Sequence, residues 1–236
     1  MTKKLLAILT MTVLLITAFP MESFALTSTQ VKQFPFSAVA YMEIEYHCGC
    51  TRRGTGAMIS RYGLITAGHN LLCTKHNKTA KYIDFWFGFF SKSDYLYHYE
   101  GSFDYTYYCD FSGGYTSKND IGFVIFKKNV GQYTGWFGTR TYSNASSMTG
   151  ASIRAMGYNV RTLKQTTGKL TSINQTQLTF TKHVDMDSEG GPVYVVENGE
   201  YYLVAVYTSS TDSEWYARRL TQEIVDTMKS KGAGFN

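Results

Sequence analysis

The fold of this chain is decided by the stretch Gly54-Thr55-Gly56-Ala57-Met58-Ile59-Ser60-Arg61-Tyr62-Gly63-Leu64-Ile65-Thr66-Ala67-Gly68-His69. Two short apolar segments, Gly56–Ile59 and Leu64–Thr66, flank a polar turn, a pattern that predicts a β-hairpin. The second segment runs directly into His69. Because the unperturbed pKa of a histidine lies near ~6.5, an imidazole at this point can act as a general base at neutral pH.

An aspartate and a serine follow His69, each beside a further apolar run. Asp120 stands in Asn119-Asp120-Ile121-Gly122-Phe123-Val124-Ile125-Phe126, and Ser188 stands in Asp185-Met186-Asp187-Ser188-Glu189-Gly190-Gly191-Pro192-Val193-Tyr194. A carboxylate can orient a histidine through its second ring nitrogen, and a serine hydroxyl can then act as a nucleophile. The order of the three makes His69, Asp120 and Ser188 the candidate catalytic residues.

These segments resemble the catalytic segments of the trypsin- and chymotrypsin-like serine proteases, nearest the bacterial glutamyl-endopeptidase branch. The resemblance covers Phe36 to Lys229 and implies an all-β fold of two six-stranded antiparallel β-barrels with a C-terminal helix. It also implies an endopeptidase that hydrolyses protein or peptide substrates through an acyl-enzyme, with His69 as base and then acid, Asp120 as orienting group and Ser188 as nucleophile. It implies no metal and no organic cofactor.

The nucleophile loop departs from the family's usual Gly-Asp-Ser-Gly-Gly-Pro pattern and leaves two registers open. If Asp187-Ser188 is aligned, Ser188 is the nucleophile, backbone N–H groups of Ser188 and Met186 face the oxyanion, and Glu189 is an extra residue. If Gly190-Gly191-Pro192 is aligned instead, Glu189 takes the nucleophile position. A glutamate there cannot form the usual acyl-enzyme and repels a developing oxyanion. We expect the first register; the alternative is a catalytically inactive, protease-like secreted binding protein.

Residues 1–25 have the pattern of a secretory signal peptide. Lys3 and Lys4 precede an apolar run from Leu5 to Phe19, and Ser23-Phe24-Ala25 forms a small-x-small cleavage signal. The run is short for a transmembrane helix and contains threonines. We therefore expect a secreted, extracellular protein without membrane contact after signal removal. A short segment or propeptide would cover residues 26–35 and a peptidase-like domain 36–236, with barrels at about 36–130 and 140–236.

The charge balance is mildly basic. The chain has a formal net charge of +5, and loss of two lysines and one glutamate with the signal peptide leaves about +4. Without a basic run, this balance favours solubility and not nucleic-acid binding. We expect a monomer with no nucleic-acid partner.

The cysteines Cys48, Cys50, Cys73 and Cys109 would meet an oxidising environment after export. The family resemblance implies a disulfide that joins Cys73 to Cys48 or Cys50, with Cys109 taking the remaining partner, although the sequence alone allows three pairings. Zinc is not expected, because Cys48-Gly49-Cys50 is spaced more closely than usual zinc ligands and no paired His/Cys set is evident elsewhere.

Alternating apolar residues separated by Gly, Asn, Asp and Ser predict many short strands. The expected strands outside the first hairpin are Ala38–Ile44, Ile83–Phe90, Ile121–Phe126, Ser152–Met156, Leu163–Thr171, Gln177–Phe180, Val193–Val196, Leu203–Tyr207 and Trp215–Ala217. Tyrosines between Tyr95 and Tyr115 are expected to flank strands with one end in water. Leu220, Ile224, Val225 and Met228 predict one face of a C-terminal helix, with Thr221 as its cap.

Overall fold

The structure is a computed structural model that describes residues 26–108, 119–142, 150–181 and 189–235. Residues 1–25, Cys109, Met186 and Ser188 lie outside the described residues, so the signal peptide and the role of Ser188 stay predictions. No helix among the described residues is both long enough and apolar enough to cross a bilayer.

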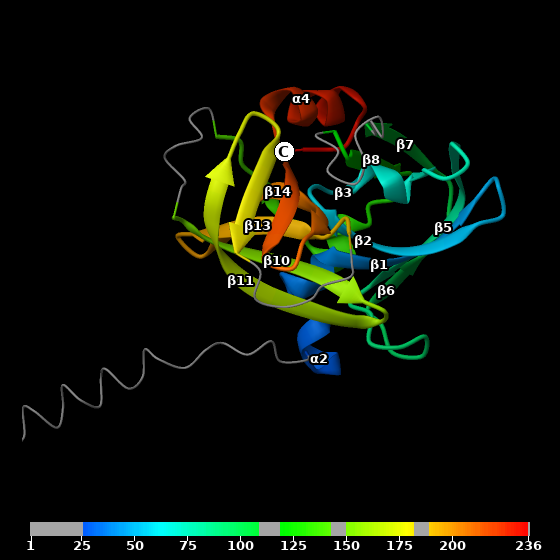
Figure 1. Ribbon diagram of the computed structural model, residues 1–236. Helices are drawn as coiled ribbons and strands as arrows, with labels where there is room; N and C mark the ends of the chain where they lie inside the picture. Colours follow the sequence, from blue (N-terminus) through cyan, green and yellow to red (C-terminus); the bar gives the residue numbers. More distant parts are fainter. Residues whose placement is uncertain (1–25, 109–118, 143–149, 182–188, 236) are drawn as a thin grey trace, which may run out of the picture.

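The first half of the chain forms one antiparallel sheet (Figure 1). Its strands are β1 (Val39–Tyr46), β2 (Thr51–Met58), β3 (Gly63–Thr66), β4 (Leu72–Cys73), β5 (Lys78–Phe87), β6 (Tyr97–Tyr99), β7 (Phe103–Tyr108) and β8 (Ile121–Phe126). Three short helices accompany them: α2 (Ser28–Val31) and the 3₁₀ helices η1 (Phe36–Ala38) and η2 (Gly68–Asn70). The strands run in the order β4-β5-β1-β2-β3-β8-β7, and β6 pairs with β5.

The second half forms a separate sheet. Its elements are α3 (Gly131–Thr134), β9 (Gly138–Thr139), β10 (Ser152–Asn159), β11 (Thr162–Ile173), β12 (Gln177–Thr181), β13 (Pro192–Glu197), β14 (Glu200–Ser210), β15 (Glu214–Arg219) and α4 (Gln222–Ser230). The order β13-β10-β11-β12-β15-β14 closes on itself, because β13 also pairs with β14. Closure removes the free edges of this sheet.

The predicted fold class of two antiparallel barrels with a C-terminal helix is confirmed. The hairpin predicted from Gly56–Ile59 and Leu64–Thr66 is β2–β3, with Gly56 opposite Thr66 and Met58 opposite Leu64. The short strands β4 and β6 bring the first sheet to eight strands, and β9 brings the second to seven. Helix α4 begins after Thr221 as predicted, but the Thr221 side chain makes no capping hydrogen bond.

The predicted disulfide between Cys73 and Cys48 or Cys50 is not formed. All three are free cysteines, although they lie in neighbouring turns of the first sheet. Cys109 lies outside the described residues, so its pairing stays a prediction.

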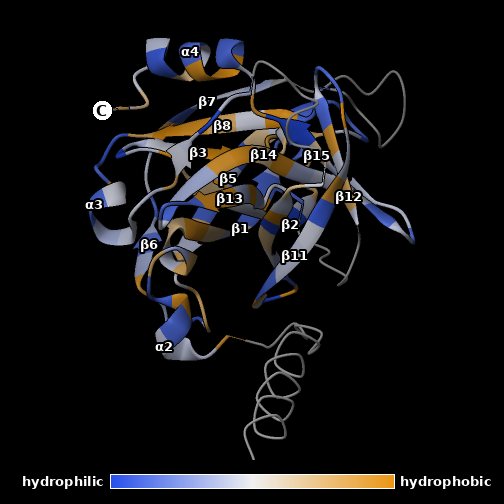
Figure 2. Ribbon diagram, turned by 90° about the vertical axis from the view of Figure 1, so that its left-hand side faces the viewer, coloured by the Kyte–Doolittle hydropathy of each residue, from blue (hydrophilic) through white to orange (hydrophobic). Residues whose placement is uncertain are grey.

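Aromatic side chains join the two barrels. Tyr158, on β10 of the second sheet, packs its ring against Tyr41 and Phe89 of the first half, with centroids 5.5 and 6.2 Å away. Its hydroxyl accepts a hydrogen bond from the Phe89 N–H at 3.1 Å and lies 3.3 Å from the Phe89 carbonyl. Figure 2 shows hydrophobic residues running along β8 and β14, which belong to different sheets. One core cluster crosses the junction, because Tyr158 of the second sheet packs in it with residues of the first, while a second cluster lies within the second sheet.

Tyr158→Phe should lower the free energy of unfolding by about 1–3 kcal/mol, because the buried Phe89 N–H loses its partner. Tyr41→Phe is the control, since the Tyr41 hydroxyl interacts with the side chains of Glu43, at 3.2 Å, and Arg161, and not with a buried backbone N–H. Urea denaturation monitored by tryptophan fluorescence measures both variants. Equal losses would show that the Tyr158 hydroxyl contributes nothing specific to the junction.

Candidate active site

His69 lies where strands β3 and β8 bring two segments together. Strand β3 ends at Thr66, which pairs with Gly122 of β8. The segment that follows β3 and carries His69 therefore lies beside Asp120, which directly precedes β8. Helix η2 then places the imidazole beside Asp120: Nδ1–H donates to Oδ2 at 2.6 Å, and the His69 backbone N–H donates to Oδ1 at 2.9 Å. Both side chains are buried, with residue exposures of 6% and 3%. The structure thus brings together two of the three predicted catalytic residues.

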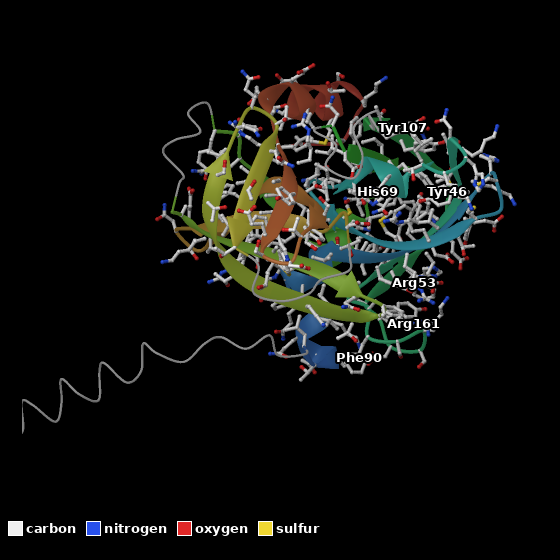
Figure 3. The ribbon with its side chains drawn as sticks, in the orientation of Figure 1. Tyr46, Arg53, His69, Phe90, Tyr107 and Arg161 are labelled. Carbon is white, nitrogen blue, oxygen red and sulfur yellow. The ribbon has the colours of Figure 1, made fainter. Side chains whose placement is uncertain are left out.

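The loop that carries His69 is also fixed from the first strand. Tyr46, at the end of β1, donates its hydroxyl hydrogen to the His69 carbonyl at 2.9 Å (Figure 3). Tyr46 is buried, so its hydroxyl makes this hydrogen bond away from solvent. This hydrogen bond fixes the His69 carbonyl, while Asp120 fixes the His69 imidazole.

Glu189 occupies the other side of the imidazole. Its Oε2 lies 3.1 Å from His69 Nε2, and the same oxygen forms an ion pair with the Arg52 guanidinium of β2. The approach to Nε2 is not aligned as a hydrogen bond, so the contact with His69 is an ion pair. Sequence reasoning held Glu189 only as an alternative, and the Gly-Gly-Pro motif that follows it was the signal that pointed to this placement.

The backbone around Glu189 is fixed by both barrels. Its carbonyl accepts hydrogen bonds from the Thr55 N–H at 3.1 Å and from Asn70 Nδ2 at 3.0 Å. The next residue, Gly190, has φ +96° and donates its N–H to the Tyr207 carbonyl at 2.8 Å. The Tyr207 N–H in turn donates to the Gly191 carbonyl at 2.9 Å. Glu189 therefore faces His69 because its own main chain has little freedom to do otherwise.

The two glycines are required by the closeness of neighbouring main chain. A Cβ on Gly190 would lie 2.1 Å from the Thr55 carbonyl oxygen, and one on Gly191 would lie 2.0 Å from the Met156 carbonyl oxygen. Thr55 belongs to β2 of the first sheet and Met156 to β10 of the second. The Gly190-Gly191 step is thus wedged between the barrels.

The surrounding charges keep the imidazole protonated. Burial lowers the pKa of His69, but the carboxylates of Asp120 and Glu189 outweigh it and raise the pKa to about 9. Burial raises the pKa of the Glu189 carboxyl, while the charges of His69 and Arg52 hold it below its ordinary value. At neutral pH the site is therefore an imidazolium between two carboxylates, and an imidazolium has no lone pair with which to accept a proton.

A surface pocket of about 690 Å³ lies beside the site, on the outer part of β1, β2 and β5. Its lining mixes both signs of charge: Glu43, Glu45, Arg52, Arg53 and Asp84. Arg52 belongs both to this pocket and to the ion pair with Glu189. A ligand in the pocket would therefore compete for, or add to, the interactions that hold Glu189.

Comparison with solved structures assigns the fold. The chain is similar to a Glu endopeptidase solved in complex with MPD (TM-score 0.71, 16% identity, 89% of this chain and 96% of that one). It is also similar to the protease Anisep from Arthrobacter nicotinovorans (TM-score 0.69, 15% identity, 86% and 99%), and to the HL collagenase (TM-score 0.68, 13% identity, 92% and 100%). These likenesses show a chymotrypsin-like serine protease fold. No protein-family model matches the chain, and no curated protein sequence matches it significantly.

Gly190→Ala should destabilise the protein more than Gly199→Ala. Both glycines have positive φ, +96° and +83°, so each alanine costs about 1–2 kcal/mol of backbone strain. A Cβ on Gly199 meets nothing within 4 Å, whereas one on Gly190 meets the Thr55 carbonyl, which adds about 1–3 kcal/mol of overpacking. Chemical denaturation measures the difference. Equal destabilisation would contradict the tight passage between the barrels.

The His69 imidazole should titrate near pH 9 in an NMR titration of ring-labelled protein, and Glu189→Gln should lower that pKa. The raised pKa stabilises the fold fully below the ordinary value of 6.5, and this contribution is lost as the pH rises through about 9. Wild-type stability should therefore fall across this interval more steeply than that of Glu189→Gln. Glu197→Gln, which removes a carboxylate paired with Arg140 instead, is the control; a Glu189→Gln variant with unchanged His69 titration would refute the ion pair.

Proposed function

We propose that this chain is a catalytically inactive, protease-like protein that binds a protein or peptide partner. One observation carries the proposal: Glu189 Oε2 lies 3.1 Å from His69 Nε2. A nucleophile activated by a histidine needs its oxygen within about 2.6–3.2 Å of that nitrogen. The carboxylate holds this position, so a serine hydroxyl and the Glu189 carboxylate cannot both be there.

The chemistry of the pair supports the same proposal. A glutamate carboxylate does not form the ester intermediate of a serine protease, and its negative charge repels the oxyanion that acyl transfer must stabilise. The same charge holds the His69 pKa at about 9, which removes the free base at neutral pH. Loss of the nucleophile and loss of the base thus have one cause.

A protein with this fold can bind a peptide without cleaving it. The solved structures similar to this chain include proteins described as proteases, and proteases act on extended peptide chains. The pocket beside Arg52 presents carboxylate and guanidinium groups, which suit a polar peptide segment better than an apolar one. We further propose that the protein is exported after loss of residues 1–25 and acts as a monomer.

A second candidate function is the serine endopeptidase with Ser188 as nucleophile. The observation in its favour is that His69 Nε2 is buried and has no aligned hydrogen-bond partner among the described residues, while Asp120 orients Nδ1. Rotation of the Glu189 side chain out toward Arg52 would free Nε2 for another group. Ser188 is the preceding residue, and its hydroxyl is the nearest candidate in sequence.

A fluorophosphonate probe, which esterifies activated serines, distinguishes the two functions. We expect no labelling of the folded wild-type protein, because the carboxylate at the nucleophile position does not react and His69 is protonated. Glu189→Ser should acquire labelling, since a hydroxyl then faces the His69–Asp120 pair. The matched control is Glu189→Ala, which removes the carboxylate without adding a nucleophile and should stay unlabelled.

The endopeptidase hypothesis predicts a different labelling pattern. Labelling of the wild type that Ser188→Ala abolishes would establish the endopeptidase and rule out the inactive protein. The His69→Ala background separates enzymatic labelling from nonspecific modification, because activated serine chemistry requires the base. Circular dichroism before labelling shows that each variant is folded.

A further inference from the structure

Two turns of the first sheet lie side by side beyond the end of the active-site loop. The first joins β1 to β2: the Tyr46 N–H donates to the Cys50 carbonyl, and the Gly49 N–H donates to the Tyr46 carbonyl, both at 2.9 Å. Gly49 allows this reversal with φ +81°. The second turn joins β4 to β5, where Cys73 pairs with Lys78. The His47 N–H donates to the Thr79 carbonyl at 3.0 Å and links the two turns.

Four metal-ligating side chains converge from these turns. Cys48 and Cys50 come from the first, and Cys73 and His76 come from the second. Their sulfur atoms and one imidazole nitrogen all lie within 4.8 Å of one another. His76 Nδ1 is 3.3 Å from Cys50 Sγ and 3.7 Å from Cys73 Sγ.

These separations match the edges of a zinc coordination tetrahedron. With Zn–S near 2.3 Å and Zn–N near 2.0–2.1 Å, tetrahedral geometry places sulfur and nitrogen ligands about 3.6 Å apart. The two measured sulfur–nitrogen distances, 3.3 and 3.7 Å, fall on either side of that value. Two of the six distances between donor atoms thus already suit an ion at the centre, and the other four are no longer than 4.8 Å.

We propose that Cys48, Cys50, Cys73 and His76 bind one zinc ion. Three thiolates and one imidazole are a complete ligand set for a structural zinc site, with no open position for a substrate or a reactive water. A disulfide explains the cluster less well, since it would use two of these sulfurs and give no role to His76, which lies close to two of the three cysteines.

The proposed zinc site differs from what the sequence alone led us to expect. Cys48-Gly49-Cys50 was too closely spaced to resemble a usual zinc motif by itself. The other half of the site is Cys73-Thr74-Lys75-His76, a two-residue spacing that is usual for zinc ligands. It went unnoticed because nothing in the sequence shows that the β4–β5 turn lies against the β1–β2 turn.

The proposed zinc site lies next to η2, so a bound ion would affect the segment that carries His69. Cys73 follows His69 after only Asn70, Leu71 and Leu72, and Tyr46 at the base of the other turn donates to the His69 carbonyl. An ion that joins the two turns would therefore hold the chain on both sides of η2. Its function is independent of whether Ser188 or Glu189 faces the imidazole.

Cobalt titration of the reduced, metal-free full-length protein tests the site. We expect one Co²⁺ per chain, with the intense visible bands of tetrahedral thiolate coordination, and complete displacement by Zn²⁺. Cys73→Ser and His76→Gln should each weaken binding by more than roughly tenfold. His47→Gln is the matched control, because His47 sits in the adjacent turn, is exposed and is outside the cluster. Zinc should also raise the thermal midpoint of the wild type more than that of His76→Gln.

Three results would overturn the proposal. Wild-type protein that gives only the weak spectrum of octahedral cobalt has no such site. Equal loss of binding in His47→Gln and His76→Gln would mean that the imidazole of His76 is not a specific ligand. A disulfide among Cys48, Cys50 and Cys73, found by unreduced peptide mapping of protein refolded with zinc, would replace the metal with a covalent link.

Discussion

The buried imidazole of His69 lies between the carboxylates of Asp120 and Glu189, and the chemistry of the site depends on that balance of charge. Asp120 and His69 are buried, and a buried charge is tolerated only when it is paired and hydrogen-bonded. Along the site the charges alternate as Asp120, His69, Glu189 and Arg52, ending at the partly exposed guanidinium. Each group therefore has an opposite charge beside it, and the line reaches solvent at only one end.

The main chain places this line of charges at the junction of the barrels. Thr55 links the two barrels through two hydrogen bonds: its N–H donates to the Glu189 carbonyl at 3.1 Å, and its hydroxyl accepts from the Tyr158 N–H at 3.0 Å. Gly190 and Gly191 then pass so close to Thr55 and Met156 that no side chain fits. The position of the Glu189 carboxylate is thus a result of barrel packing more than of the ion pairs it makes.

How much the sequence could predict follows from the range of the interactions involved. Period-two apolar runs depend on neighbouring residues, so strands such as β1, β8 and β12 were predicted close to their actual positions. Short strands such as β4 and β9 carry no such pattern and are set by their partners. The tyrosine-rich segment contains β6 and β7, so several of its tyrosines lie within strands and do not merely flank them; Tyr105 and Tyr107 lie on one side of β7 with ring centroids 6.4 Å apart.

The residues of the site can be divided in the same way, into those set by local sequence pattern and those set by long-range contacts. His69 and Asp120 were predicted because each adjoins a recognisable strand, and their pairing follows from the β3–β8 register. The placement of Glu189 was predicted only as the alternative register, because the choice depends on which backbone atoms meet Gly190 and Gly191 across the barrel junction. His76 was missed for a similar reason, since two turns far apart in the sequence meet only in the folded sheet.

Retention of His69 and Asp120 does not by itself indicate catalysis. Removing one partner of a buried ion pair costs about 3–5 kcal/mol, because the other charge is left unpaired. The Asp120 carboxylate also accepts the His69 backbone N–H at 2.9 Å, so its loss would release the loop as well as the imidazole. Once a carboxylate at position 189 balances the imidazolium, the pair contributes to folding whether or not a nucleophile is present. A protein that no longer hydrolyses peptides would therefore keep these two residues for stability and lose only the serine.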